Sequence, residues 1–345
     1  MASPFGRSAA TLALATVGGL GFAALGLPLP FLFGPMAVCL MAALAGAPLR
    51  GAGDLGVAMR TILGVAIGAS ITPDVLARAP QMLGSLALIP LYVVVIGLVG
   101  VPFFRRLGFD AQTAWYAAMP GGLSDMLIFG QEAGADLRAL SLIHATRVLV
   151  VVVAAPVILT GFYGADITGA VGAPARDLPP HEMVLMALAG LAGWKGAERV
   201  GLFGASILGP MLVTAALSLS GLIHTRPPGE AIIVAQLFIG VSIGAQYVGV
   251  TLRELRVFVL SGLAFVALLA VLAAAFAELV ILTGLAAPVE AFLAFAPGGQ
   301  AEMTVLALVA GADLGFVIVH HLTRILFVIL GAPVAARLFG AGPKG

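Results

Sequence analysis

The sequence predicts an all-α, polytopic membrane protein made of two tandem repeats. Hydrophobic residues make up 61% of the chain and charged residues only 10%, whereas a soluble domain carries roughly 25% charged residues. The mean hydropathy is +1.13, and the apolar runs approach the ~20 residues that a bilayer-spanning helix needs. A β-barrel would show short alternating segments instead. The third observation is an internal duplication, described below.

Each half of the chain contains six apolar segments that we expect to be helical. In the first half they fall at about 9–25, 31–46, 55–72, 82–103, 112–130 and 139–163. In the second half they fall at about 183–197, 202–222, 231–250, 257–284, 291–310 and 316–339. A polar stretch rich in Gly, Pro and Ala separates the halves. We therefore expect a first membrane repeat at 1–163, a linker at 164–182 and a second membrane repeat at 183–345.

One block of sequence occurs twice in the chain, and its two copies are offset by 177 residues. The first copy contains Pro120, Gly121, Gly122, Asp125, His144 and Arg147. The second contains Pro297, Gly298, Gly299, Glu302, His321 and Arg324. Repetition over such a length indicates a tandem duplication. In a membrane protein, ionisable residues inside apolar sequence are functional candidates because their burial is costly.

Pro-Gly-Gly is expected to break the fifth segment of each half. Proline removes a backbone donor and collides with the preceding turn, and the glycines add conformational freedom. The helices should therefore end at Met119-Pro120 and Ala296-Pro297, and each proline could begin a second half-helix. Backbone groups freed at membrane depth persist only where protein or a water-filled cavity satisfies them. Both breaks should therefore line a cavity.

The positive charges predict that the two repeats have opposite orientations. In the N-terminal half, most positive charges lie in the second and fourth loops between the apolar segments. In the C-terminal half, most of them lie in the first and third loops. The residues concerned are Arg50, Arg105 and Arg106, and then Lys195, Arg199, Arg253 and Arg256. Under the positive-inside rule, this change of side fits two repeats of opposite orientation in the membrane. An odd number of crossings per repeat then requires one re-entrant segment, for which the Pro-Gly-Gly segment is the candidate.

Asp125 and Glu302 fall in the first turn of the predicted second half-helices. Unpaired N–H groups and the positive end of the helix dipole favour a carboxylate at this place. One interpretation is that each acid only caps its own helix. The other is that the repeat symmetry brings the two carboxylates together, where they bind a cation, a proton or a cationic group.

His-x-x-Arg occurs once in each repeat, and residues three apart share one face of a helix. An arginine in an apolar run needs an acid, carbonyl groups or water as its partner. One interpretation is a structural ion pair between Asp125 and Arg147, repeated at Glu302 and Arg324. The other is that the arginines bind substrate. The histidines could couple either process to protons, since their ordinary pKa lies near neutrality.

Small residues spaced four apart predict close helix packing at Gly64/Gly68 and Gly240/Gly244. Arg60 and its counterpart Gln236 lie one turn from these glycines and are polar in both copies, so they are second-rank residues for lining a binding site. Asp residues directly before the sixth segments predict N-caps. These are Asp136 and Asp313.

Several function classes find no support in the sequence. It lacks a Walker loop, Gly-x-Ser-x-Gly, His-Glu-x-x-His and any cysteine cluster, so we expect no enzyme activity, metal or cofactor. A net charge of +1 gives no sign of a nucleic-acid partner. The expected partners are the lipid bilayer and a small-molecule or ion substrate, and a homo-oligomer is left open.

The duplicated pattern of Pro-Gly-Gly-x-x-Asp/Glu-Met followed by His-x-x-Arg resembles the AbrB-type integral membrane proteins of bacteria. The resemblance covers essentially the whole chain. Family members are often labelled ammonia monooxygenase or transition-state regulator, so the resemblance implies a membrane location and a role in gene regulation. It implies no particular functional residues. The monooxygenase label finds no copper or iron ligand set in this sequence.

Repeated broken helices with buried ionisable residues are typical of secondary transporters. We therefore expect a permease for a small solute, coupled to protons or cations. The alternative is a membrane sensor that alters gene expression without moving its ligand. A membrane-embedded enzyme is the third hypothesis.

Overall fold

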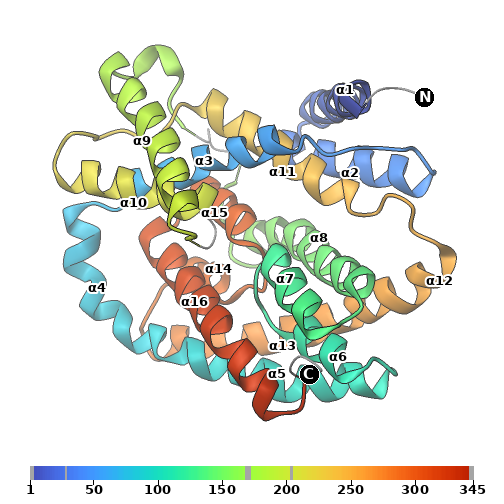
Figure 1. The fold of residues 1–345 in the computed structure, drawn as a ribbon. Coiled ribbons are helices and arrows are strands. Elements are labelled where there is room, and N and C mark those ends of the chain that lie inside the picture. The colour runs from blue at the N-terminus through green and yellow to red at the C-terminus, as the bar shows by residue number, and fades with distance from the viewer. Residues whose placement is uncertain (1–3, 28, 168–171, 203–204, 342–345) are drawn as a thin grey trace. The chain divides into compact units, whose positions relative to one another are not determined.

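All regular elements in the part of the chain that the structure describes are helices (Figure 1). This part of the computed structural model comprises residues 4–27, 29–167, 172–202 and 205–341, without the side chains of 4, 5, 74–76, 78, 79 and 124. The first helices are α1 (Pro4–Ala24), α2 (Pro30–Leu44), α3 (Asp54–Ala69), α4 (Pro73–Leu86), α5 (Leu88–Arg106), α6 (Ala111–Ala118), α7 (Leu123–Ala133) and α8 (Leu137–Gly161). Those that follow are η1 (Ala175–Asp177), α9 (Pro180–Arg199), α10 (Ala205–Leu219), α11 (Gly229–Ala245), α12 (Leu252–Glu254), η2 (Leu255–Val259), α13 (Leu260–Leu282), α14 (Pro288–Phe295), α15 (Gln300–Val309) and α16 (Leu314–Leu338).

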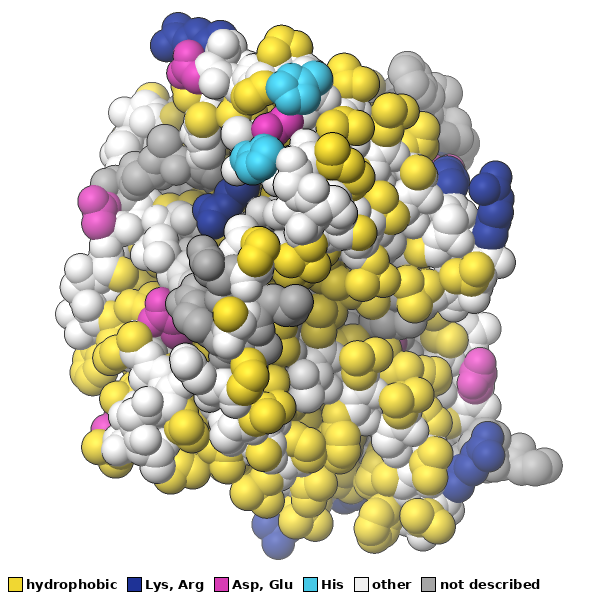
Figure 2. Space-filling model, turned by 90° about the vertical axis from the view of Figure 1, so that its left-hand side faces the viewer, with side chains coloured by type: hydrophobic (Ala, Val, Ile, Leu, Met, Phe, Trp, Pro, Cys, Tyr) yellow, Lys and Arg dark blue, Asp and Glu magenta, His cyan; other side chains and the backbone are white. Residues whose placement is uncertain are grey.

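Four helical stretches are long and apolar enough to cross a membrane. They are Pro80–Arg106, Leu137–Gly161, Leu252–Leu282 and Leu314–Leu338. Their outward side chains are often large and hydrophobic, as at Leu98 and Leu330. Figure 2 shows one face on which hydrophobic side chains prevail and charged ones are few. Such a surface suits contact with lipid, because soluble monomers rarely expose large apolar patches.

The chain divides into two compact units, and each unit draws on both halves of the sequence. The first unit comprises Met1–Pro80, Leu159–Gly249 and Thr304–Gly315. The second comprises Gln81–Ile158, Val250–Met303 and Phe316–Gly345. The compact units therefore divide the chain differently from the sequence repeats. The predicted linker lies within the first unit, and its residues 168–171 lie outside the described part of the chain.

In the first unit, helices from opposite halves pack closely through the predicted glycine pairs. α3 packs against α10, and α11 packs against α2. A methyl group on Gly68 would lie 2.5 Å from the carbonyl oxygen of Met211, and one on Gly244 would lie 2.6 Å from Cβ of Cys39. The small residues therefore permit a backbone approach that a side chain would block. The predicted packing role of the glycine pairs is confirmed.

A buried carboxylate fixes a loop of the first unit to the beginning of α9. Glu182 is 4% exposed. It accepts hydrogen bonds from the backbone N–H groups of His224 and Thr225, at 3.0 and 2.9 Å, and from the Thr225 hydroxyl at 2.7 Å. Burial raises the pKa of Glu182, but these hydrogen bonds outweigh burial and lower the pKa to about 2. No sequence pattern indicates this anchor.

The second unit contains both Pro-Gly-Gly sequences and both His-x-x-Arg pairs. Aromatic packing forms part of its core. The ring centroid of Tyr92 on α5 lies 5.0 Å from that of Phe276 on α13 and 5.5 Å from that of Phe295 on α14. These rings join the last turn of α14 to two of the longer helices, so the end of that short helix is held in place.

Candidate functional site

Both Pro-Gly-Gly sequences break their helices where the sequence predicts. α6 ends at Ala118, and Met119 is extended with φ −67° and ψ 131°. α14 ends at Phe295, and Ala296 is extended with φ −54° and ψ 132°. A residue before proline avoids the helical region because the proline ring crowds it. The breaks are therefore dictated locally by the proline.

The second half-helices begin later than expected. Pro120 and Pro297 do not begin them: α7 starts at Leu123 and α15 at Gln300. Gly122 is the N-cap of α7, with φ −66° and ψ 146°. Glycine is a poor residue inside a helix but is accepted at the N-cap. Both glycines of each motif therefore stay outside the regular helix.

Each histidine supplies the hydrogen bond that the proline of its own copy cannot make. In a continuous helix the Tyr116 carbonyl would accept from the N–H of residue 120, but Pro120 has no N–H. The Nε2 atom of His144, a fully buried residue, lies 3.0 Å from this carbonyl oxygen. A carbonyl only accepts, so Nε2 donates. His144 therefore replaces the missing backbone donor of the broken helix.

The same relation recurs in the second copy. The Leu293 carbonyl lies four residues before Pro297 and would lack a donor for the same reason. Nε2 of His321 lies 2.8 Å from its oxygen. In both copies the histidine and the carbonyl are 28 residues apart. The histidine position is therefore matched to the proline position.

The arginines span the broken backbone. Arg147 donates from Nη1 to the Met119 carbonyl at 3.3 Å and from Nη2 to the Gly121 carbonyl at 2.7 Å. Arg324 makes the equivalent bonds to the carbonyls of Ala296 and Gly298, at 2.8 and 2.9 Å. Each guanidinium thus lies at the C-terminal end of a half-helix, where the helix dipole favours a cation.

These contacts correct the expected ion pairs of Asp125 with Arg147 and of Glu302 with Arg324. Neither arginine forms an ion pair with a carboxylate of the described residues. The breaks leave backbone carbonyls that need donors, and the guanidinium groups satisfy these carbonyls instead. The requirement that buried backbone groups be paired decides the arrangement.

The hydrogen bonds also fix the protonation state of His321. Its Nε2 donates to a carbonyl, and Nη2 of Arg324 lies 3.0 Å from its Nδ1. A guanidinium only donates, so Nδ1 must accept and therefore carries no proton. His321 is neutral in this arrangement, because a second proton would place two cations against each other. The geometry thus gives this histidine a structural role at the second break.

The acids occupy the predicted first turns of α7 and α15. Each carboxylate folds back over the second glycine of its motif. A methyl group on Gly122 would lie 2.5 Å from Oδ2 of Asp125, and one on Gly299 would collide with Oε2 of Glu302. This placement favours the capping interpretation, in which a first-turn acid reaches back to the start of its helix. A side chain at the second residue after proline would require this carboxylate to move.

The first glycine of each motif packs against a methionine side chain. A methyl group on Gly121 would lie 2.6 Å from Cε of Met126, and one on Gly298 would lie 2.6 Å from Cε of Met303. Each methionine follows the acid directly, so the break accommodates its side chain. The two glycines and the methionine therefore belong to one packing arrangement that sequence reasoning did not identify.

The two breaks lie near each other. A methyl group on Gly121 of the first break would lie 3.1 Å from Cγ1 of Val328, which is on α16, the helix that carries Arg324. The second break has one further donor, since the hydroxyl of Tyr92 donates to the Phe295 carbonyl at 2.9 Å. The corresponding stretch of α13 holds Leu268 and Leu269, neither of which can donate. The breaks are therefore similar in construction but not identical.

Arg60 and Gln236, the second-rank residues, belong to the first unit. Both Pro-Gly-Gly sequences belong to the second unit. Nη2 of Arg60 lies 3.5 Å from the hydroxyl of Ser242. Gln236 is 1% exposed, and its Nε2 has no hydrogen-bond partner in the described part of the chain. A search of the described residues finds no group of three or more His, Cys, Asp or Glu side chains that could hold a metal ion.

The remaining predicted details concern the sixth segments. Oδ1 of Asp136 accepts from the backbone N–H of Ala139 at 3.0 Å, so the predicted N-cap of α8 is confirmed. α16 begins at Leu314, directly after Asp313. These helices carry the His-x-x-Arg pairs, and a fixed start sets which residues face the breaks.

The protein is helical, and four of its helical stretches are long and apolar enough to cross a membrane. Two further helices are broken, and His and Arg side chains donate hydrogen bonds to the carbonyls at both breaks. The model of a family described as "Transition state regulatory protein AbrB" matches residues 31–340, so the chain belongs to the AbrB family. It is 29% identical over 337 residues to "Putative regulator AbrB" of Escherichia coli (strain K12), with 94% of each chain covered. It is 28% identical over 359 residues to "Uncharacterized protein YhjN" of Bacillus subtilis (strain 168), covering 95% of this chain and 91% of the relative.

Proposed function

We propose that this AbrB-family protein is a secondary transporter of a small solute in the bacterial inner membrane, coupled to protons or cations. The observation that carries the proposal is the pair of broken helices in one compact unit, each with a buried arginine on its break and an acid in the first turn that follows. Broken helices at repeat interfaces are where secondary transporters bind substrate and coupling ions. In this proposal the repeats 1–163 and 183–345 have opposite orientations in the membrane.

Asp125 and Glu302 are the coupling residues in this proposal. The histidines and arginines hold backbone carbonyls and cannot leave them without opening the breaks. Asp125 is 4% exposed and has no ion-pair partner among the described residues. A carboxylate buried in this way needs a proton or a cation to remain at membrane depth. Binding and release of that cation would change the charge at the start of α7.

The test is solute-driven ion movement in proteoliposomes. Purified protein is reconstituted with an internal pH-sensitive dye, and amines, carboxylates and amino acids are added in turn. We expect one solute class to drive proton or cation movement, and Asp125→Asn to abolish it. The matched control is Asp110→Asn, because Asp110 caps α6 by accepting from the N–H of Thr113 at 2.9 Å and asparagine caps a helix equally well. Folded protein that moves nothing across the whole panel would contradict the proposal.

The second candidate is a membrane sensor that binds a ligand without moving it. The observation that favours it is the word "regulator" in the name of the Escherichia coli relative and the corresponding family description. Ligand-dependent thermal stabilisation without flux, together with altered transcription in a deletion strain, would select the sensor. Flux that depends on Asp125 would select the transporter.

A further inference from the structure

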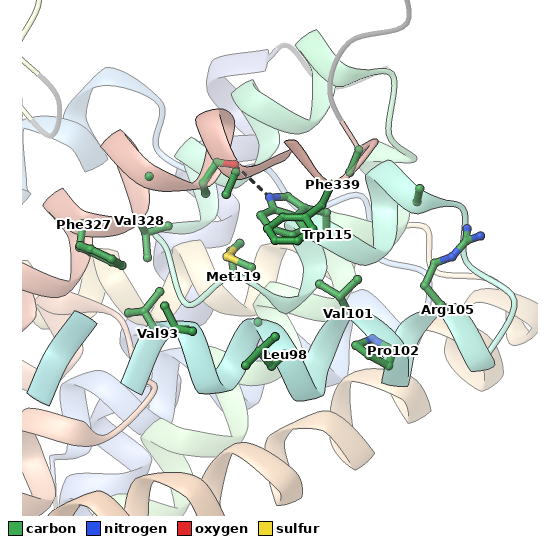
Figure 3. A pocket seen from close by; sticks show the side chains of 17 residues that line it. Val93, Leu98, Val101, Pro102, Arg105, Trp115, Met119, Phe327, Val328 and Phe339 are labelled. Atoms are coloured by element: carbon green, nitrogen blue, oxygen red, sulfur yellow. Dashed lines mark hydrogen bonds between the residues drawn. The ribbon is translucent and has the colours of Figure 1, made fainter. Parts of the chain in front are cut away.

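The second unit contains an elongated apolar cavity of about 590 Å³. It lies between α5, α6 and α16, and Figure 3 shows the side chains along it. Sites for small molecules have volumes of roughly 300–1,000 Å³, so the cavity is large enough for a ligand. The predicted site residues of the sequence do not include any residue that lines it.

The walls of the cavity leave almost no polar group for a ligand. The indole N–H of Trp115 donates to the Ala332 carbonyl at 3.1 Å, so only the apolar body of this side chain is left to line the space. The ring of Phe339 stacks on Trp115 with the centroids 5.7 Å apart. Among the described residues that line the cavity, Arg105 is the only charged one.

The charge lies at one end of the cavity. Figure 3 shows Arg105 at the opposite end from Val93 and Phe327. Arg105 is in the last turn of α5 and is exposed. It donates from Nη1 to the Phe109 carbonyl at 3.0 Å, which leaves its other N–H groups for a headgroup. The cavity therefore combines a long apolar part with a cationic end.

The position of the cavity along the helices suits a ligand from the membrane. α5 and α16 both belong to candidate membrane spans. Their cavity-lining residues Leu98 and Phe327 are 68% and 37% exposed, so the cavity reaches the surface of these helices. Basic residues at the ends of spanning helices lie near the lipid headgroups. Arg105 would then lie at headgroup level and the apolar part at hydrocarbon depth.

We infer that this cavity binds an aliphatic chain with an anionic headgroup, the chain along Trp115 and Leu98 and the headgroup at Arg105. A long-chain carboxylate and an acyl chain of an anionic phospholipid share this chemistry. The equivalent positions in the other half hold Ile281 for Arg105 and Phe292 for Trp115, since the Ile281 carbonyl accepts from the N–H of Gly284 as the Arg105 carbonyl accepts from that of Gly108. The cationic end is therefore a property of one half and not a consequence of the duplication.

The cavity also touches one of the breaks. Met119 lines the cavity with its side chain, and its carbonyl oxygen accepts from Arg147. A bound chain would therefore contact the residue that ends α6. The inference itself does not depend on transport, because it rests on the cavity and Arg105 alone.

The test uses fluorescence of Trp115, one of two tryptophans in the chain. In a Trp194→Phe background, protein in neutral-lipid nanodiscs is titrated with dibromostearate, dibromostearyl alcohol, or dibrominated phosphatidylglycerol or phosphatidylcholine. We expect saturable quenching by the anionic compounds and weaker quenching by the neutral ones. The stearate and phosphatidylglycerol arms distinguish a free fatty acid from a membrane lipid as the source of the chain.

Two variants separate the cavity from ordinary lipid contact. Arg105→Gln should weaken binding of the anionic compounds roughly fivefold to tenfold, the size of one cation–anion interaction near a membrane surface. Arg106→Gln is the matched control, since Arg106 is also exposed in the last turn of α5 but does not line the cavity. Gly331 lines the cavity and a methyl group there would meet no atom within 4 Å. Gly331→Leu should project into the cavity and weaken the saturable quenching.

Two outcomes would overturn the inference. One is equal quenching by anionic and neutral compounds with no effect of Arg105→Gln. The other is quenching that never saturates and persists in folded Gly331→Leu protein, which would mean bulk lipid contact only. If Gly331→Leu does not fold, the comparison of Arg105→Gln with Arg106→Gln decides the question.

Discussion

Replacing His144 by phenylalanine tests whether the histidine stands in for the missing proline N–H. The substitution keeps an aromatic ring in a fully buried place and removes the donor to the Tyr116 carbonyl. A buried carbonyl that loses its donor costs about 1–3 kcal/mol. We therefore expect His144→Phe to lower the free energy of unfolding by about that amount.

The second arm of the experiment restores the backbone donor. Pro120→Ala supplies an N–H that reaches the Tyr116 carbonyl when α6 continues by one residue and Met119 becomes helical. In the parent protein this carbonyl already has its donor, so Pro120→Ala alone should change the free energy of unfolding only a little. In the His144→Phe background it should recover most of the loss. The expected coupling energy between the two positions is about 1–3 kcal/mol.

The assay is reversible unfolding in detergent, followed by far-UV circular dichroism for the four members of the cycle. His181→Phe is the control, since His181 is an exposed histidine on α9 and surface substitutions usually change stability by less than about 0.5 kcal/mol. Strict additivity of the two substitutions would refute the reasoning. It would mean that His144 stabilises the protein by packing and not by serving the carbonyl.

Three further predictions follow from the same structure. Arg147→Lys should destabilise the protein by about 2 kcal/mol in the same assay, because an ammonium cannot span two carbonyls as a guanidinium does; unchanged stability would contradict the bridging role. Gly68→Ala should lower the temperature of thermal unfolding, because its methyl group would lie 2.5 Å from the backbone carbonyl oxygen of Met211, whereas Gly331→Ala meets no atom within 4 Å and should not lower it; equal effects of the two substitutions would contradict the close packing of α3 on α10. The lowered pKa of Glu182, about 2 against the ordinary 4.5, means that its ionised form stabilises the folded state above pH 4.5 and that this contribution is lost as the pH falls toward 2. Glu182→Gln should therefore lower the melting temperature more at pH 7 than at pH 3, and an equal effect at both pH values would argue against the anchor.

The parts of the fold that depend on local chemistry were predictable from the sequence. Pro-Gly-Gly determines where α6 and α14 end, because proline acts on its own turn and on the residue before it. Asp136 caps α8 for an equally local reason. The close packing at Gly68 and Gly244 also follows from residue size alone. These features need no knowledge of which segments meet in three dimensions.

The partners of the arginines could not be predicted in the same way. Every residue has a carbonyl, so the sequence contains no mark of the acceptors at Met119 and Gly121. The acid at Asp125 is the more visible partner in the sequence, but Arg147 forms no ion pair with it among the described residues. Only the packing of α8 beside the break shows that residues 26 and 28 apart meet there. The same holds for the cavity, whose walls come from distant parts of the chain.

The contacts between α8 and the end of α6 have a mechanical consequence. A helix interruption is often a flexible joint, but this one is bound by three hydrogen bonds from two side chains on a single neighbouring helix. Opening it would strand three carbonyls and a guanidinium away from water, at a free energy far above thermal energy of about 0.6 kcal/mol. The end of α6 and α8 should therefore move as one rigid piece. The places that bend belong elsewhere in the chain, and the π-helical turn at Leu255–Val259, directly before α13, is one where the regular bonding pattern already changes.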